Sequence, residues 1–287
     1  MTPFIKTNFH THSTFCDGKS TLEQSVISAI KKQIKILGFS GHSVYPAFFD
    51  TCNMKIEDFP EYTKQIRLLK EKYKEQIEIL LGFEADFVPS VTKPDFYAYR
   101  EFNPDFLIGS VHYLRQNEQT HNDFFAVDNS PDFFLEGLKT IYNGSIKELI
   151  GHYFSTQRQM LKEGNFTIIG HPDLVRKFNG TLKLFTEKED WYIAELKETA
   201  KAIKKAGVIA EINTGAISRG YDVIYPSEYF LSLLHENYVP VTINSDCHDC
   251  RYLDCAFDKA MIMAKKAGYN ELACLKEKKV IFQKIEY

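Results

Sequence analysis

The residues best suited to chemistry are histidines and carboxylates that follow short apolar stretches of the chain. In extended backbone alternate side chains point the same way, so His10 and His12 can face one metal ion. Imidazole suits Zn, Fe, Mn or Ni, and carboxylates add hard oxygen ligands that can bridge two ions. With Asp17, from the loop after the first histidine pair, the full set is His10, His12, Asp17, His42, Glu84, His112, His171, Asp246 and His248.

This set is too large for one tetrahedral ion. It predicts two or three divalent transition-metal ions (Zn, Fe or Mn), each with a position left for water or substrate. The alternative is a set of hydrogen-bonded polar groups at strand ends. We disfavour it, because so many converging ionisable groups would be costly to bury without a cation.

The elements that must position these residues alternate along the chain. Short apolar runs predict strands over 4–9, 34–40, 77–84, 105–111, 166–170, 207–213 and 240–244. Amphipathic stretches predict helices over 21–33, 57–75, 145–163, 188–206, 226–237 and 254–267. Such alternation indicates an α/β fold with a parallel sheet. Six of these seven strands end in a His, Asp or Glu, and their convergence on one point favours a closed barrel over an open doubly wound sheet.

Composition agrees with one such barrel and excludes some functions. The 287 residues are 44% hydrophobic and 25% charged, as in an ordinary globular protein. A net charge of −3 lacks the excess of positive charge that non-specific nucleic-acid binding requires. The N-terminal segment has no apolar signal core and no run is long enough to span a bilayer, so we expect a cytoplasmic protein without membrane contact.

Three cysteines, Cys247, Cys250 and Cys255, lie close together in the sequence. They are either a small zinc knot or reduced thiols that happen to be neighbours. We favour reduced thiols, because no second CxxC completes a four-ligand site.

The ordered motifs resemble those of the PHP (polymerase and histidinol phosphatase) superfamily. They are HTH at 10–12, GH at 41–42, GFE at 82–84, SVH at 110–112, GHPD at 170–173 and SDCH at 245–248. The stretches GHPDLVRKF (170–178) and NTGAISRG…YPS (213–227) resemble the stand-alone histidinol-phosphate phosphatase branch. The resemblance implies a distorted seven-stranded TIM-like (β/α) barrel, a single domain over 1–287, a trinuclear metal site and hydrolysis of L-histidinol phosphate to L-histidinol and phosphate.

The resemblance also implies a distribution of the ligands. The first metal would be held by His10, His12, Glu84 and Asp246, the second by Glu84, His112 and His171, and the third by Asp17, His42 and His248. Some relatives have histidine in place of Asp17, and the harder ligand here would shift the third site towards Mn or Fe.

As a mechanism, a metal-bridging water would attack phosphorus in line as hydroxide. The leaving alkoxide would take a proton from Asp17, Asp246 or His248, and the sequence does not choose between them. Arg176 and Arg219 lie in loops after strands and Arg158 in a helix; each is a candidate phosphate clamp or a solvated surface residue.

Several further residues have two possible roles. The long aromatic loop from Tyr113 to Pro131 is either a lid over the site or a flap packed on the barrel rim, and His121 within it is a candidate substrate contact. Glu211 and Asn213 are either orienters of the ligands or buried hydrogen-bonding groups. Asp173 either orients a ligand histidine or caps a turn, while His152 and His235 are expected at helix surfaces or ends.

Three functions follow from these observations. The leading one is a phosphomonoesterase acting on the small molecule L-histidinol phosphate, with no nucleic-acid partner and an undetermined oligomeric state. The second is a PHP-type nuclease or nucleotide phosphatase. The third is a non-catalytic metal-binding module, against which the completeness of the ligand motifs argues.

Overall fold

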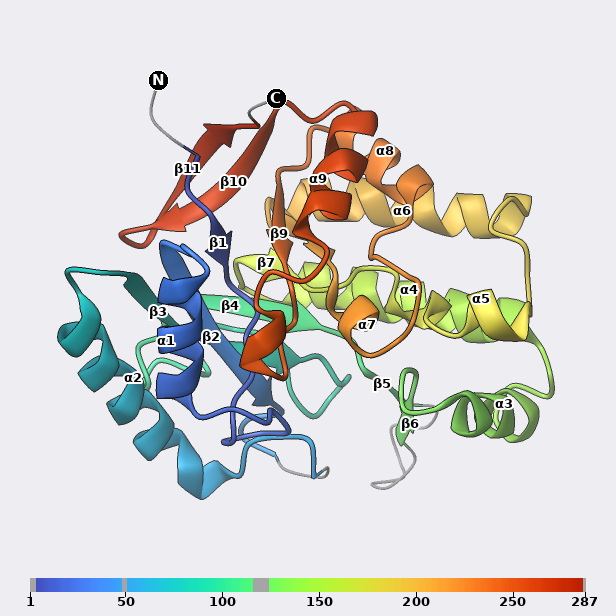
Figure 1. The fold of residues 1–287 in the computed structure, drawn as a ribbon. Coiled ribbons are helices and arrows are strands. Elements are labelled where there is room, and N and C mark those ends of the chain that lie inside the picture. Colours follow the sequence, from blue (N-terminus) through green and yellow to red (C-terminus); the bar gives the residue numbers. More distant parts are fainter. Residues whose placement is uncertain (1–3, 48–50, 116–123, 286–287) are drawn as a thin grey trace.

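Seven parallel strands form a nearly closed barrel in the computed structural model, which describes residues 4–47, 51–115 and 124–285 (Figure 1). Along the sheet they are β1 (Thr7–Asn8), β2 (Ile36–Ser43), β3 (Glu78–Asp86), β4 (Phe106–Ser110), β7 (Ile168–Ile169), β8 (Ile209–Asn213) and β9 (Val241–Asn244). Just beyond β1 and β9, Thr11 and Cys247 form a parallel bridge, and the amide of Cys247 donates to the His10 carbonyl at 3.0 Å. The predicted distorted seven-stranded barrel is therefore confirmed.

The strand residues alternate between a buried outer layer and the barrel interior, as a period of two requires. On β3, Leu80 packs inside the barrel, whereas Leu81 and Phe83 belong to the larger core between strands and helices. The inward position Gly82 leaves room for the Phe106 ring, since a Cβ there would lie 2.5 Å from its Cζ atom. The interior is thus apolar and filled towards the amino ends of the strands, and polar groups follow at the carboxyl ends.

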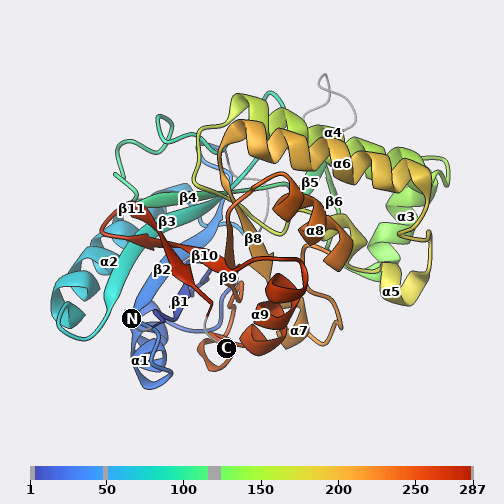
Figure 2. The same cartoon turned by 90° about the horizontal axis from the view of Figure 1, so that it is seen from above.

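The predicted helices are present with slightly different ends: α1 (Leu22–Lys31), α2 (Phe59–Tyr73), α4 (Ile146–Glu163), α6 (Asp190–Ala206), α8 (Glu228–Glu236) and α9 (Phe257–Lys266). Thr21 caps α1 by accepting from the amide of Gln24, whose side chain accepts from the Thr21 amide in return. Helices α4 and α6 lie side by side outside the barrel (Figure 2). Among the described residues, no helix is long and apolar enough to cross a membrane.

Several elements were not predicted from the sequence. The shorter helices are η1 (Ile56–Asp58), α3 (Pro131–Thr140), η2 (Leu174–Arg176), α5 (Asn179–Leu182), α7 (Gly215–Ser218) and η3 (Cys250–Tyr252). The hairpin of β5 (Tyr113–Arg115) and β6 (Phe124–Ala126) follows β4.

A second hairpin, of β10 (Glu271–Lys276) and β11 (Lys279–Lys284), lies across the amino ends of the barrel strands (Figure 1). Its residues Ala273, Cys274 and Leu275 pack into the same apolar cluster as Phe9 and Phe106. The hairpin therefore covers the end of the barrel opposite the predicted site.

Candidate metal centre

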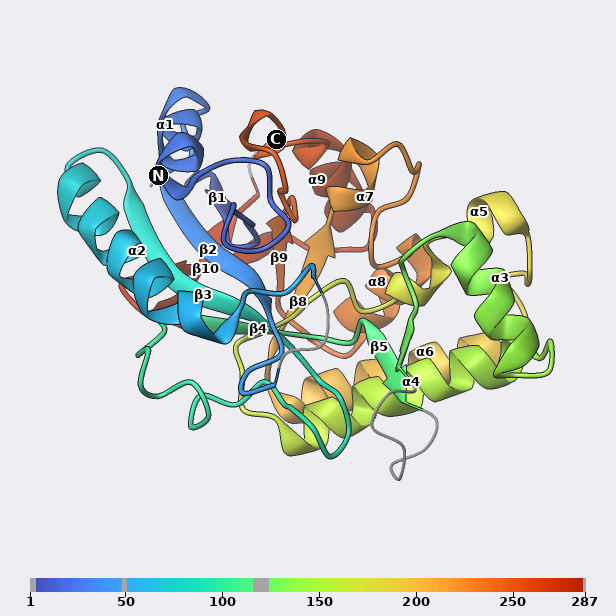
Figure 3. The same ribbon diagram turned by 90° about the horizontal axis from the view of Figure 1, so that it is seen from below.

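The carboxyl ends of the barrel strands meet at one mouth of the barrel (Figure 3). The nine predicted ligand residues come together there. Potential ligand atoms fall into three groups whose members lie within 4.8 Å of one another. The groups are His10, His12 and Asp246; His42, Glu84 and His112; and His12, Asp17, His42 and His248. His171 joins them through its Nε2 atom, 2.9 Å from Oε1 of Glu84.

Four buried atoms converge at the first of these places. Nε2 of His10 lies 3.0 Å from Oε2 of Glu84 and 3.7 Å from Oδ1 of Asp246. Nε2 of His12 lies 3.5 and 3.1 Å from the same two oxygens. Ligand atoms at about 2.0–2.1 Å from one tetrahedral ion would lie about 3.4 Å apart, so the four atoms are spaced as a metal requires.

The same four atoms also lack hydrogen bonds. Within the described part of the chain, none of them has a hydrogen-bond partner of normal geometry, although all are buried. Burying such atoms without a partner costs free energy, which a bound cation would recover. The residues present therefore fit the divalent ion that the sequence predicts.

Glu84 is placed to bridge two metal positions. Its Oε2 atom faces the first group, while Oε1 lies 3.5 Å from Nε2 of His112 and 2.9 Å from Nε2 of His171. Ser110 donates a hydrogen bond of 2.7 Å to the same Oε1. This arrangement agrees with a second ion held by Glu84, His112 and His171.

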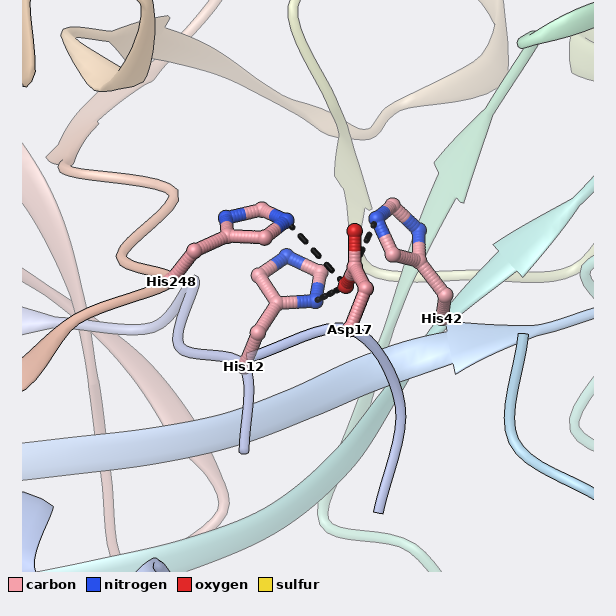
Figure 4. A group of neighbouring side chains, drawn as sticks. All are labelled: His12, Asp17, His42 and His248. Atoms are coloured by element: carbon pink, nitrogen blue, oxygen red, sulfur yellow. Dashed lines mark ion pairs between the residues drawn. The ribbon is translucent and has the colours of Figure 1, made fainter. Parts of the chain in front are cut away.

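The third group surrounds Asp17 at the mouth of the barrel (Figure 4). Its Oδ1 atom lies 3.3 Å from Nε2 of His248, 3.8 Å from Nε2 of His42 and 4.0 Å from Nδ1 of His12. His42 also reaches the Glu84 carboxylate, with Nδ1 at 2.9 Å from Oε2. His42 thus links the third group to the second, as His12 links it to the first.

The pKa values of the two histidines in the first group are shifted in opposite directions. Burial lowers the pKa of His10, but the carboxylates of Glu211, Glu84 and Asp246 outweigh this and hold it well above the ordinary value. Burial and the neighbouring His248 and His42 instead hold the pKa of His12 well below its ordinary value. Imidazole binds metals in its neutral form, so a bound cation would favour that form in both rings.

Glu211 forms hydrogen bonds with two predicted ligand residues. Its Oε1 atom lies 2.7 Å from Nδ1 of His10, and Oε2 accepts from the backbone amide of His171 at 2.9 Å. The side-chain amides of Asn213 and Asn244 donate to the same carboxylate, at 2.9 and 3.0 Å. Because Nδ1 of His10 is engaged by Glu211, its Nε2 atom faces the metal position.

Asp86 orients the ring of His112 in the same way, and it was not identified as a site residue from the sequence. Its Oδ1 atom lies 2.8 Å from Nδ1 of His112 and accepts from that residue's backbone amide at 3.2 Å. The available signal was the spacing, since Asp86 follows Glu84 by two residues and so lies on the same face of β3.

Comparison with known proteins assigns the family. The family model described as PHP domain matches residues 8–215.

The chain belongs to the PHP domain family.

Named relatives of this PHP chain cover most of its length. A protein of Schizosaccharomyces pombe named "Probable histidinol-phosphatase" is 27% identical over 283 residues, covering 94% of this chain and 89% of that protein. The histidinol-phosphatase of Bacillus subtilis is 26% identical, covering 88% of this chain and 97% of its own. The crystal structure of histidinol phosphate phosphatase from Lactococcus lactis, complexed with Zn, L-histidinol and phosphate, superimposes with a TM-score of 0.69. It is 21% identical and covers 96% of this chain and 98% of its own, which supports the fold.

Only one of the three candidate arginines reaches the PHP cluster. Arg219 donates from Nη2 to Oδ2 of Asp246 at 2.8 Å, and its Nη1 lies 3.1 Å from Nδ1 of His248. Burial lowers the pKa of Arg219, but Asp246 outweighs this and raises it, so the side chain is a permanent cation. It lines the cavity over the cluster.

The other two arginines are placed elsewhere. Arg158 bonds to Glu195 at 2.7 Å, between α4 and α6. Arg176 is bonded to Glu187 and to the Ile224 carbonyl, and it lines a different surface hollow. Neither guanidinium is placed to clamp a phosphate on the cluster, because helix packing and local ion pairs turn both away from it.

A cavity of about 360 Å³ lies over the cluster. Besides predicted ligands and Arg219, its lining includes Tyr113, Ala126, Asp128, Asn129 and Lys177. Four of these residues come from the loop predicted as a lid or rim flap, of which 116–123, with His121, lie outside the described residues. Asp128 and Lys177 were not predicted as site residues.

The remaining sequence hypotheses concern residues away from the cluster. Asp173 accepts at 2.7 Å from the amide of Ser227, the N-cap residue of α8. His152 bonds to the hydroxyl of Tyr142 at 2.9 Å, and His235 packs on the Tyr269 ring. None of the described groups able to hold a metal contains a cysteine, so the structure gives the zinc knot no support.

Proposed function

We propose that this PHP chain hydrolyses L-histidinol phosphate to L-histidinol and phosphate, using two or three divalent metal ions. The observation that carries the metal chemistry is the convergence of four buried atoms, from His10, His12, Glu84 and Asp246, that make no hydrogen bond within the described part of the chain and lie beneath a cavity. Relatives named histidinol-phosphatase along nearly the whole chain support the substrate.

Bound divalent ions would neutralise phosphate charge and lower the pKa of a water towards neutrality, which makes it a nucleophile. The chain contributes the positions of the groups around them. Arg219 points its guanidinium into the cavity beside Asp246, where it can donate to a phosphate oxygen as negative charge builds up. Glu211 and Asp86 fix the rings of His10 and His112 and so reduce the reorganisation needed during the reaction.

The leaving alkoxide needs a proton. Asp246 is poorly suited, because Oδ1 faces the metal position and Oδ2 accepts from Arg219. Its pKa is raised by burial but held well below the usual range by Arg219 and His10. Burial also raises the pKa of Asp17, but His42 and His248 outweigh this and hold it well below the usual range. This favours His248, whose side chain is 17% exposed and lines the cavity.

One assay tests the proposal. Metal-reconstituted protein is offered L-histidinol phosphate, nucleoside monophosphates and a short single-stranded oligonucleotide, with a chelator-treated sample as control. We expect the highest kcat/KM with L-histidinol phosphate and no turnover after chelation. A preference for either nucleotide substrate would favour the nuclease or nucleotide phosphatase, and folded, metal-loaded protein without turnover would favour the binding module.

Two further proposals concern the whole chain. We propose that 1–287 act as one domain, because the closing strand β9 and the hairpin β10–β11 pack on the first strands. We also propose a cytoplasmic location, in line with a role in amino-acid biosynthesis.

A further inference from the structure

One carboxylate in the cavity wall does not belong to the metal cluster. Among the described lining residues the carboxylates are Asp17, Asp246 and Asp128, and the first two face the metal positions. Asp128 follows β6 and meets Lys177, which follows η2. The Lys177 ammonium lies 3.2 Å from Oδ2 of Asp128 and donates to its backbone carbonyl at 2.8 Å. The cavity wall therefore contains a carboxylate that lies outside the metal cluster.

Asp128 is charged and firmly held. Burial raises its pKa, but Lys177 and His112 outweigh this and bring it to about 2. The amide of Val127 bonds to the His112 carbonyl at 2.9 Å, which ties the segment to the end of β4. Both side chains line the cavity, and that of Asp128 is 28% exposed whereas that of Lys177 is only 8% exposed, so the carboxylate is the more accessible of the two groups.

The second oxygen of the Asp128 carboxylate, Oδ1, is available to bind a ligand. Within the described part of the chain only Oδ2 is bonded, which leaves Oδ1 able to accept. The surroundings are otherwise cationic, since Arg219 and Lys177 line the same wall and the cluster is predicted to hold metal ions. A ligand that carries a positive charge would be repelled by these cations unless a carboxylate such as Asp128 bound it, because like charges in a partly buried site repel strongly.

We propose that Asp128 binds the ammonium group of the substrate and selects phosphomonoesters that carry a cationic amine close to the phosphate. The assignment rests on the proposed function, because L-histidinol phosphate has its ammonium on the carbon next to the phosphate-bearing one. With the phosphate held by the cluster and Arg219, the ammonium must find an acceptor in the remaining wall. Lys177 acts as a positioning residue, which holds Oδ2 and the backbone of Asp128.

The test compares substrates that differ only in the amine. The pairs are L-histidinol phosphate with its des-amino analogue, and phosphoethanolamine with ethyl phosphate. Wild type should favour the amine-bearing member of each pair, and Asp128→Asn should reduce that preference about 10- to 100-fold, the value of one hydrogen bond between charged groups. Asp132→Asn is the matched control, since Asp132 is an exposed carboxylate four residues further on.

The outcomes separate this proposal from its alternatives. If Asp128→Asn lowers kcat/KM equally for both members of each pair, Asp128 is only a structural clamp on Lys177 and the proposal is wrong. A wild type without preference in either pair also overturns it. If L-histidinol phosphate is not a substrate but the variant still loses a preference for phosphoethanolamine, the proposed function fails and the ammonium site stands. Should Asp128→Asn not fold, Asp128→Glu, which keeps the charge but moves it, must shift the same ratios.

Discussion

Replacing Glu211 by glutamine keeps the shape of the side chain but turns one of its two oxygens into an NH2 group. In the structure that carboxylate accepts four hydrogen bonds, from Nδ1 of His10, the backbone amide of His171 and the side chains of Asn213 and Asn244. An NH2 in the Oε2 position would face two donors. An NH2 in the Oε1 position would force a proton from Nδ1 of His10 onto Nε2, the atom that faces the metal.

Either orientation therefore disrupts two bonds to a buried charge, because donors are left facing each other or the bond to His10 is reversed. Each is worth about 1.5–3 kcal/mol, so we expect the metal-free variant to lose about 3–6 kcal/mol of unfolding free energy. Metal affinity should fall about 10- to 100-fold, as when the partner of a ligating histidine is removed. The activity at limiting metal should fall with it.

Two measurements check this prediction. Urea unfolding of the metal-free proteins gives the stability, and metal content after dialysis against graded chelator gives the affinity. Glu198→Gln is the control, because Glu198 is 61% exposed and its ion pair with Lys201 lies in solvent; it should leave both stability and metal content unchanged. If Glu211→Gln matched that control in both measurements, the supporting role of Glu211 would be refuted.

Three further predictions test other parts of the molecule. Arg219→Ala should lower kcat/KM for the phosphoester about 100-fold or more, whereas Arg158→Ala should leave it unchanged; equal effects would contradict the separation of these arginines. Gly82→Ala should destabilise the protein by about 1–3 kcal/mol in denaturant unfolding, because its Cβ would lie 2.5 Å from Phe106; an unchanged midpoint would mean that the barrel interior has spare room. Burial lowers the pKa of His152, so the unfolded state binds more protons just below pH 6.5 and stability falls as the pH drops below that value. Wild type should therefore lose up to about 1.4 kcal/mol per pH unit more than His152→Gln between pH 6.5 and 5.5, and parallel curves would contradict the assigned shift.

Much of the site could be predicted because strand geometry is local. The HxH pair and the residues at strand ends were recognisable from a period of two and from the shared edge of parallel strands. The barrel followed from their convergence. Glu211 was identified as a candidate orienter for the same reason, since it ends a strand beside the predicted ligands.

Other features depend on contacts that no local pattern encodes. Lys177 meets Asp128, 49 positions away along the chain, and Arg158 is turned outwards by Glu195 on another helix. Asp246 adopts a φ of 45°, a left-handed conformation that is uncommon for a residue other than glycine. The sequence motif marks Asp246 as a ligand, but it does not reveal the backbone turn that aims its carboxylate at His12.

The hairpin β10–β11 covers the far end of the barrel, and this has a kinetic consequence. Its residues fill the amino ends of the strands together with Phe9 and Phe106, so among the described residues the cluster can be reached only through the mouth beside Asp128 and Arg219. Substrate and both products must therefore pass through the same opening. Under the proposed function, phosphate bound at the cluster would lie behind the alcohol, so the alcohol would have to leave first. Turnover should thus follow an ordered release, with phosphate a competitive inhibitor and L-histidinol a non-competitive one.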